Sequence, residues 1–329
     1  MSHKRKLYIK DTVFLLSSRV EENLPFAMNE VINTGLWGIL ARAKHLYDVS
    51  ICHFVFMANH FHILAVARNE EDIPRFVKQI KQESAAMINR FCGVRQKTVW
   101  CDGFDDPVIL TADKVIKYIE YIYLNPANAH LVKSIEQFPG VSSWEMYKNN
   151  TLVKECVWLK RSSFFKLNHK LHNLLEREQR KLIDAMASVD GEKKYYTFTL
   201  EPNAWMQCFP EYVDVDAERL NEQIIQSIKE QERQIRHENG VLGVTKLKTQ
   251  HINKRFKSEK FGRRMICICS DIKVRVAFIA WFKEVSERAR EMYKKIKQGM
   301  ADVVFPPGMF LPGGRLLEPQ GKSILADMW

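Results

Sequence analysis

Two apolar runs close together constrain the fold of this chain most. The first covers residues 53–57, His-Phe-Val-Phe-Met, and the second covers residues 63–67, Ile-Leu-Ala-Val-Ala. Short runs rich in β-branched and aromatic residues are typical of strands. Ala58-Asn59 is the expected break between them. The sequence therefore predicts two neighbouring strands at the centre of a sheet.

Two histidines, His60 and His62, stand at the start of the second predicted strand. Side chains alternate along a strand, so both imidazoles point to one face while Phe61 points to the other. Imidazoles about 7 Å apart on one face can share a metal ion. The alternative is a pair of half-buried histidines whose polar atoms are satisfied within the fold.

Helical periodicity predicts helices over residues 25–47, 70–92 and 113–124, with further strands over 7–17 and 98–100. This order of elements fits an α+β fold, broadly ferredoxin-like, in which helices cover one face of an antiparallel sheet. The polar stretch 148–150, Lys-Asn-Asn, indicates a linker. We therefore expect one domain over residues 1–150 and a separate extension over 151–329.

The extension is basic, and helical patterns predict that it is mainly helical, with helices near residues 161–187, 216–237 and 271–299. Its 32 basic residues outnumber 23 acidic ones, whereas residues 1–150 carry 18 against 16. An excess of positive charge favours a polyanionic partner, nucleic acid first. In the Lys-rich stretch 246–264 we expect DNA contacts, and the alternative is a solvated charged surface. The candidate residues are Lys246, Lys248, Lys254 and Arg255.

Several classes of protein are disfavoured by composition. No apolar stretch reaches the roughly 20 residues that a membrane span needs. Lys10 and Asp11 interrupt the apolar segment after the basic N-terminus, which argues against a signal peptide and for a cytoplasmic protein. The seven cysteines are scattered without the spacing of a zinc site, so we expect buried, reduced thiols.

The third predicted helix carries a second set of polar residues. Tyr121 and Asn125 lie one turn apart on a surface away from the apolar stripe, with Lys117 one turn earlier and Tyr118 beside them. A phenol can attack phosphorus, and an amide oxygen can be a third ligand to a divalent cation. Packing tyrosines and a helix end before Pro126 are the alternative interpretation.

Two motifs in this order resemble a known family. Residues 57–64, Met-Ala-Asn-His-Phe-His-Ile-Leu, are similar to the segment M-P-N-H-x-H-hydrophobic, and residues 121–129 are similar to Y-I-x-x-N-P-x-x-A. Trp100 and the stretch 106–108 resemble the segment between them. Over residues 5–145 the chain thus resembles the single-tyrosine HUH transposases of small insertion sequences, most of all the REP-associated branch.

The resemblance implies a ferredoxin-like nuclease domain that uses Mg²⁺ or Mn²⁺. It implies cleavage of single-stranded DNA beside a hairpin, a 5′-phosphotyrosine intermediate and strand transfer. By this resemblance His60, His62 and Asn125 are metal ligands and Tyr121 is the nucleophile, while Lys117 and Tyr118 are candidate DNA contacts. The chain departs from the family at Ala58, where proline is usual, and in the acidic stretch 101–104.

Two other functions stay open from the sequence. The first is a nickase of replication-initiator or relaxase type, although the chain lacks the helicase P-loop of a large initiator. The second is a DNA-binding regulator with a dispensable site. A homodimer is also open, as is whether Tyr121 serves the metal site of its own chain or of a partner.

Overall fold

The computed structural model describes most of the chain. The described residues are 6–92, 98–160, 171–188, 192–252, 254–255, 265–300, 303–306 and 308–309. Parts of three predicted segments lie outside them: residues 161–170 of the first basic helix, 256–264 of the Lys-rich stretch and 310–314 of the Pro/Gly-rich tail.

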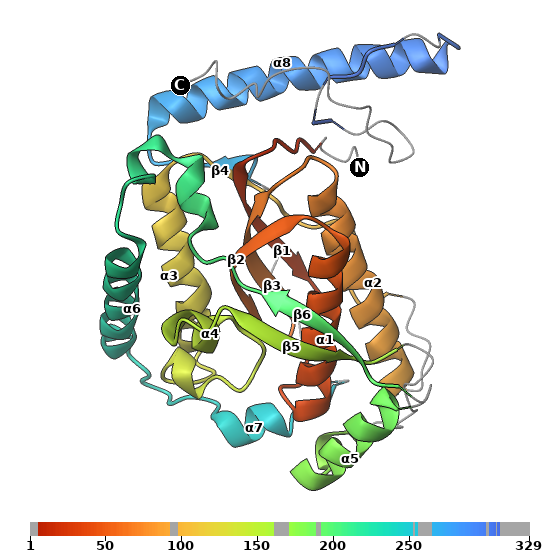
Figure 1. The fold of residues 1–329 in the computed structure, drawn as a ribbon, viewed down its shortest axis with the longest axis vertical. Coiled ribbons are helices and arrows are strands. Elements are labelled where there is room, and N and C mark those ends of the chain that lie inside the picture. The colour runs from red at the N-terminus through yellow and green to blue at the C-terminus, as the bar shows by residue number, and fades with distance from the viewer. Residues whose placement is uncertain are drawn as a thin grey trace.

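A mixed sheet forms the centre of the molecule (Figure 1). Its strand order is β2-β3-β1-β4-β7, in which the first four strands pair antiparallel and β7 pairs parallel with β4. Helix α1 follows β1, and α2 follows β3, so the first four strands have the ferredoxin-like order. The predicted α+β class is confirmed. The bounds are β1 (Thr12–Arg19), α1 (Glu30–Leu46), β2 (Val49–Phe56), β3 (His60–Ala67), α2 (Asp72–Cys92), β4 (Val108–Ile109) and β7 (Cys267–Ile268).

Helices cover both faces of this sheet, whereas the sequence led us to expect them on one. Phe61 is fully buried on the face of α1 and α2, where its ring centroid lies 5.3 Å from that of Trp100. The Trp100 indole donates a hydrogen bond to Ser84 of α2. His62, on the opposite face, meets Tyr121 of helix α3 (Ala112–Asn128). Burial on both faces explains why the two central strands are continuous apolar runs.

Helix α3 is fixed to the sheet along its whole length. Its apolar stripe, Val115, Ile119 and Ile122, is fully buried. The buried Tyr123 hydroxyl lies 2.8 Å from Nδ1 of His53 on β2, which holds the helix at one position on the strand. The helix continues through Pro126 to Asn128 rather than ending near residue 124. Proline is accommodated there because the break in hydrogen bonding falls in the final turn.

The residues after 150 pack on this sheet and its helices. Strands β5 (Val153–Trp158) and β6 (Lys194–Thr199) form a two-stranded sheet over α1, α6 (Ala217–Gln234) packs on α3, and α8 (Ile272–Lys297) follows β7. One hydrophobic core includes residues from both sides of position 150. Helices α5 (Glu176–Ala187), α6 and α8 lie within the three stretches of the extension that were predicted to be helical, and the domain boundary at 150 stays a prediction. The remaining elements are α4 (Trp144–Lys148), α7 (Val244–Lys248) and short 3-10 turns at Ile135–Gln137, Leu171–Asn173, Ala204–Cys208 and Pro210–Tyr212.

No helix within the described residues is both long and apolar enough to cross a membrane.

Candidate functional site

The two histidines stand together at the start of β3. Their ring centroids are 5.0 Å apart, and both rings face α3. Nδ1 of His60 lies 2.7 Å from the side-chain oxygen of Asn59. An amide oxygen only accepts, so Nδ1 of His60 carries the proton and the lone pair is on its Nε2. A metal-binding imidazole needs this tautomer with its second nitrogen held by a neighbour.

Both imidazoles are held in the neutral form. Burial, followed by the nearby Arg19 charge, lowers the pKa of His60 to about 4. Burial, followed by the charges of His60 and Arg19, holds the pKa of His62 well below its usual value. The neutral ring is the form that binds a metal ion. The buried Nδ1 of His62 also has no hydrogen-bond partner among the described residues.

Tyr121 lies directly against this pair. Its hydroxyl is 3.4 Å from Nε2 of His62, and the two ring centroids are 5.1 Å apart. The side chain is 40% exposed, so a solvent-side substrate can reach the phenol. Burial of the rest of the ring raises the pKa of Tyr121, while a hydrogen bond from Asn125 and the Arg19 charge oppose that rise. The phenol is therefore protonated at neutral pH and needs help to become a nucleophile.

Asn125 completes the constellation that the sequence predicts. It is buried one turn after Tyr121, and its side chain hydrogen bonds to both Tyr121 and His60. Two imidazole nitrogens and one amide oxygen thus converge beside an exposed phenol. Among the described residues, no three His, Cys, Asp or Glu side chains gather at one metal site. The set of His60, His62 and Asn125 is not such a cluster, because its third member is an amide. It fits a divalent cation that accepts both nitrogen and oxygen ligands.

Arg19 is a site residue that the sequence did not reveal. It ends β1 and pairs in register with His60 on β3, which places the two side chains on one face. Its charge acts on His60, His62 and Tyr121 alike. A basic residue at a strand end is too common a pattern to be singled out before the strand register is known.

The other predicted DNA contacts fall into two groups. Tyr118 is half-buried with its ring centroid 5.8 Å from that of Tyr121, and Lys117 is exposed on the same helix. Both therefore lie beside Tyr121. The basic residues Lys246, Lys248, Lys254 and Arg255 lie on and after α7, outside hydrogen-bonding contact with the site, and all are exposed.

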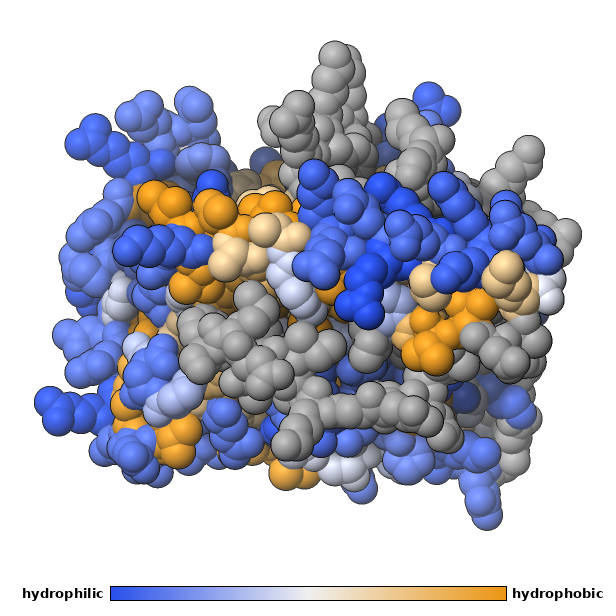
Figure 2. Space-filling view, turned by 90° about the horizontal axis from the view of Figure 1, so that it is seen from above, coloured by the Kyte–Doolittle hydropathy of each residue, from blue (hydrophilic) through white to orange (hydrophobic). Residues whose placement is uncertain are grey.

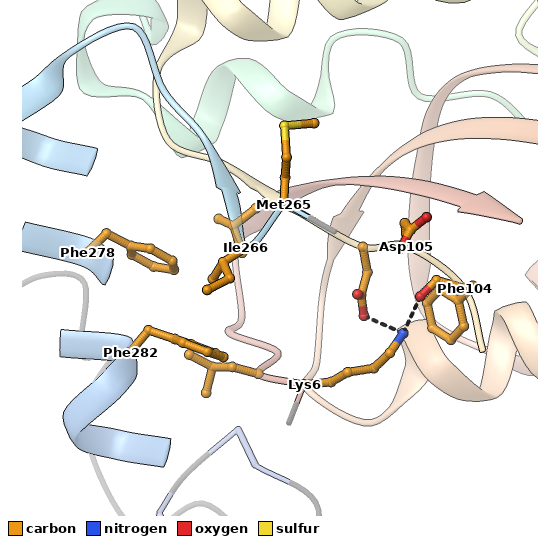
Figure 3. Close-up of a pocket in the computed structure, with 10 residues that line it drawn as sticks. Lys6, Phe104, Asp105, Met265, Ile266, Phe278 and Phe282 are labelled. Carbon is orange, nitrogen blue, oxygen red and sulfur yellow. Dashed lines mark hydrogen bonds and ion pairs between the residues drawn. The ribbon is translucent and has the colours of Figure 1, made fainter. Parts of the chain in front are cut away.

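A pocket of about 50 Å³ lies elsewhere, where β4, β7 and α8 meet (Figure 3). Phe278 and Phe282 of α8 form one wall. On the other side, the Lys6 amine donates to the carbonyl of Phe104 and pairs with Asp106 at 2.9 Å. The positive charge of Lys6 is thus compensated by Asp106, and the pocket is too small for a nucleotide.

Comparison with known proteins gives a match in sequence and several in structure, two of which are described below. Residues 24–125 match the family model described as Transposase IS200 like. A REP-associated tyrosine transposase bound to a REP hairpin aligns with a TM-score of 0.39 and 20% identity, over 46% of this chain and 87% of that one. A protein of Deinococcus radiodurans R1, provisionally assigned as a transposase, aligns with a TM-score of 0.24 and 20% identity, over 33% and 88%. No curated protein matches.

The two superpositions score too low to carry an argument, so the family rests on the sequence match. That match begins after β1 and ends at Asn125, and it includes both histidines and Tyr121. Over residues 24–125 the chain is therefore similar to the IS200-like transposase family.

Proposed function

We propose that this protein is a DNA transposase that cuts and rejoins single-stranded DNA through a covalent 5′-phosphotyrosine on Tyr121. One observation carries the proposal: the Tyr121 hydroxyl lies 3.4 Å from His62 in the same chain, with His60 and Asn125 around it. A tyrosine that serves only for packing is normally surrounded by apolar side chains. The Tyr121 hydroxyl instead lies at the surface beside two neutral imidazoles and a buried amide.

His60, His62 and Asn125 would hold a divalent cation, which we propose is Mg²⁺ or Mn²⁺. When bound, such an ion supplies Lewis acidity toward a phosphate oxygen. The family resemblance motivates this assignment, and the neutral histidines with their fixed tautomer support it.

The chain's own residues supply nucleophile and positioning. The Tyr121 oxygen attacks phosphorus, a P–O bond to tyrosine forms, and the bond to the 3′-oxygen breaks. The phenolic proton is lost and the 3′-oxygen gains one, so the step balances. Arg19 favours the phenolate because its charge lowers the pKa of Tyr121. Attack by a 3′-hydroxyl on the phosphotyrosine then reverses the step with a new strand.

The substrate that we propose is single-stranded DNA next to a hairpin, as the resemblance to REP-associated transposases implies. The aromatic pair Tyr118 and Tyr121 could stack on unpaired bases on either side of the scissile phosphate.

The test is capture of the covalent intermediate. The full chain is incubated with Mn²⁺ and labelled single-stranded DNA from the flanks of its own gene, and a denaturing gel then reveals any protein-linked DNA. We expect a slow band that is lost in Tyr121→Phe and in His62→Ala. Tyr118→Phe is the matched control, because it removes a neighbouring phenol and should keep the band.

Other outcomes select other functions. A band that is lost in Tyr118→Phe and kept in Tyr121→Phe would show that Tyr118, and not Tyr121, is the nucleophile. Nicking without strand transfer would favour an initiator or relaxase type of nickase. Tight binding without any band on any flank would refute the enzyme and leave a DNA-binding regulator.

A further inference from the structure

The chain after α6 crosses the catalytic domain as a short basic segment. This basic belt comprises residues 242–252 and 254–255, and it includes α7. At its first end Leu242 and Gly243 donate backbone hydrogen bonds of 2.9 Å to His130 and Leu131, just beyond the end of α3. At its second end the carbonyl of Lys254 accepts from Leu24, 3.1 Å away. Arg255 there forms a β-bridge with Asn23.

These two attachment points flank the metal-ligand end of the site. His130 follows Asn125 by little more than one helical turn. On the other side, the backbone of Val20 donates to Asn59 and that of Phe26 donates to Ala58, the two residues just before His60. Segments joined in this way lie about 5 Å apart, so the second end of the belt is a few backbone spacings from His60. Figure 1 shows α7 at the end of the molecule opposite α8.

Apolar side chains anchor the basic belt to the core of the protein. Leu247 is fully buried and Ile252 is 2% exposed, and both belong to the main core. The carbonyl of Leu247 accepts from the backbone of Met28, and the His251 ring centroid lies 4.5 Å from that of His172, with the two planes tilted by 49°. Gly243 has a φ of 88°, which lets the chain turn into α7 at a conformation that other residues rarely adopt. The backbone therefore holds its side chains at defined positions.

Three cations project from this anchored backbone without compensation. Lys246, Lys254 and Arg255 are exposed, and none forms an ion pair with a described residue. Lys248, in contrast, pairs with Glu176 of α5 at 3.0 Å, which ties the belt to that helix. Exposed cations on an anchored backbone, near a site proposed to cleave phosphodiesters, are suited to contact the phosphates of a nucleic-acid backbone.

We infer that the basic belt binds the phosphates of the single-stranded DNA that leads into the site, through Lys246, Lys254 and Arg255. The inference rests on the proposed function, since it assigns the belt to the same substrate. The belt contacts the sugar–phosphate backbone and not base edges, so it adds affinity and register without sequence choice. Lys248 serves to position the belt and makes no phosphate contact.

The test measures how binding depends on salt. All proteins carry Tyr121→Phe, which prevents covalent capture, and bind a fluorescein-labelled single strand from the flank of the gene. The belt variant adds Lys246→Ala, Lys254→Ala and Arg255→Ala. A matched control removes three exposed cations from the distant helix α8, namely Lys273, Arg275 and Lys283. Figure 2 shows the face that carries α8, where hydrophilic side chains lie beside apolar patches.

In the belt variant, the plot of log affinity against log salt should be less steep by about 2 than in the parent. Three phosphate contacts are removed, and each contact on a single strand contributes about 0.7 to the steepness. At 0.1 M salt this corresponds to an affinity loss of about 100-fold. The control should stay within about threefold of the parent, as expected for charges remote from the strand. Equal losses in both variants, or an unchanged slope in the belt variant, would refute the inference.

A separate measurement distinguishes this inference from the function on which it rests. The same triple substitution is placed in the chain that retains Tyr121, and adduct formation is measured at saturating DNA. If the unmodified chain forms no adduct, the proposed function fails, whatever the salt slope. If it forms the adduct and the slope does not change, only the belt inference fails. Circular dichroism of each variant confirms that the fold is kept, as expected for exposed side chains.

Discussion

Glu232 on α6 offers a quantitative test of how the extension holds helix α3, which carries Tyr121. Its carboxylate accepts a hydrogen bond of 2.6 Å from the backbone of Ile135, in the turn after α3, and its side chain is largely buried. Burial raises the pKa of Glu232 to about 7, and the nearby Glu136 charge adds to the rise. The hydrogen bond from Ile135 and the charge of Lys229 only partly oppose it. At neutral pH this carboxyl therefore titrates within the folded protein.

Proton linkage sets the direction in which the free energy of unfolding changes with pH. Between the unfolded pKa, about 4.5, and the folded pKa, about 7, the folded state binds more protons than the unfolded state. The free energy of unfolding therefore falls as pH rises through this window, and the full cost is present above pH 7. A rise of 2.5 units corresponds to about 3 kcal/mol at most. Because a folded protein relaxes around a buried charge, we expect about 2 kcal/mol.

Glu232→Gln keeps an oxygen to accept from Ile135 and removes the charge. We expect the variant to be about 2 kcal/mol more stable than the parent at pH 8 and equal to it near pH 4. Urea denaturation of both proteins across this range measures the difference. Glu230→Gln is the control, since Glu230 lies on the same helix, is 54% exposed, pairs with Arg233 and accepts a hydrogen bond from Gln234. A difference for Glu232→Gln that does not change with pH would refute the reasoning.

Three further predictions concern the site and its support. Tyr123→Phe removes the hydrogen bond to His53, so we expect a loss of about 1–2 kcal/mol in urea denaturation and slower adduct formation at Tyr121. Gly38→Ala would place a methyl group 2.4 Å from the carbonyl of Val157, so we expect thermal denaturation to show a loss of about 1–3 kcal/mol. Because the pKa of His60 is about 4, calorimetry should detect Mn²⁺ binding down to about pH 5. A site of ordinary imidazoles would lose Mn²⁺ binding near pH 6.5. Loss of Mn²⁺ binding at pH 6.5 would therefore contradict the burial of His60.

Local patterns account for what the sequence predicted well. Strand β3, which carries His60 and His62, and its neighbour β2 are buried on both faces, so each is a continuous apolar run that is visible without its partners. The apolar stripe of α3 likewise separates Tyr121 and Asn125 from the core by helical period alone. Both halves of the candidate site were therefore found, because each depends on spacing within one element.

Relations between elements could not be read in the same way. An amphipathic stripe shows that α3 packs on a sheet, but it does not show on which face of the sheet the helix lies. Arg19 enters the site only through the register of β1 against β3. Strand β5 begins with three exposed residues and shows no apolar alternation, so the sheet that it forms with β6 over α1 was missed.

The packing of α3 bears on whether Tyr121 works on its own chain. The helix lies between the sheet and α6, where the Ser227 hydroxyl donates to Glu120, the neighbour of Tyr121 in sequence. Transfer to a partner would expose three fully buried side chains of the stripe, at about 1.5–3 kcal/mol each. We therefore expect catalysis within one chain. A mixture of Tyr121→Phe and His62→Ala proteins should form no adduct, because neither chain holds a whole site. Adduct formation by the mixture would show that α3 leaves its sheet, and the estimated cost of exposing its stripe would then be wrong.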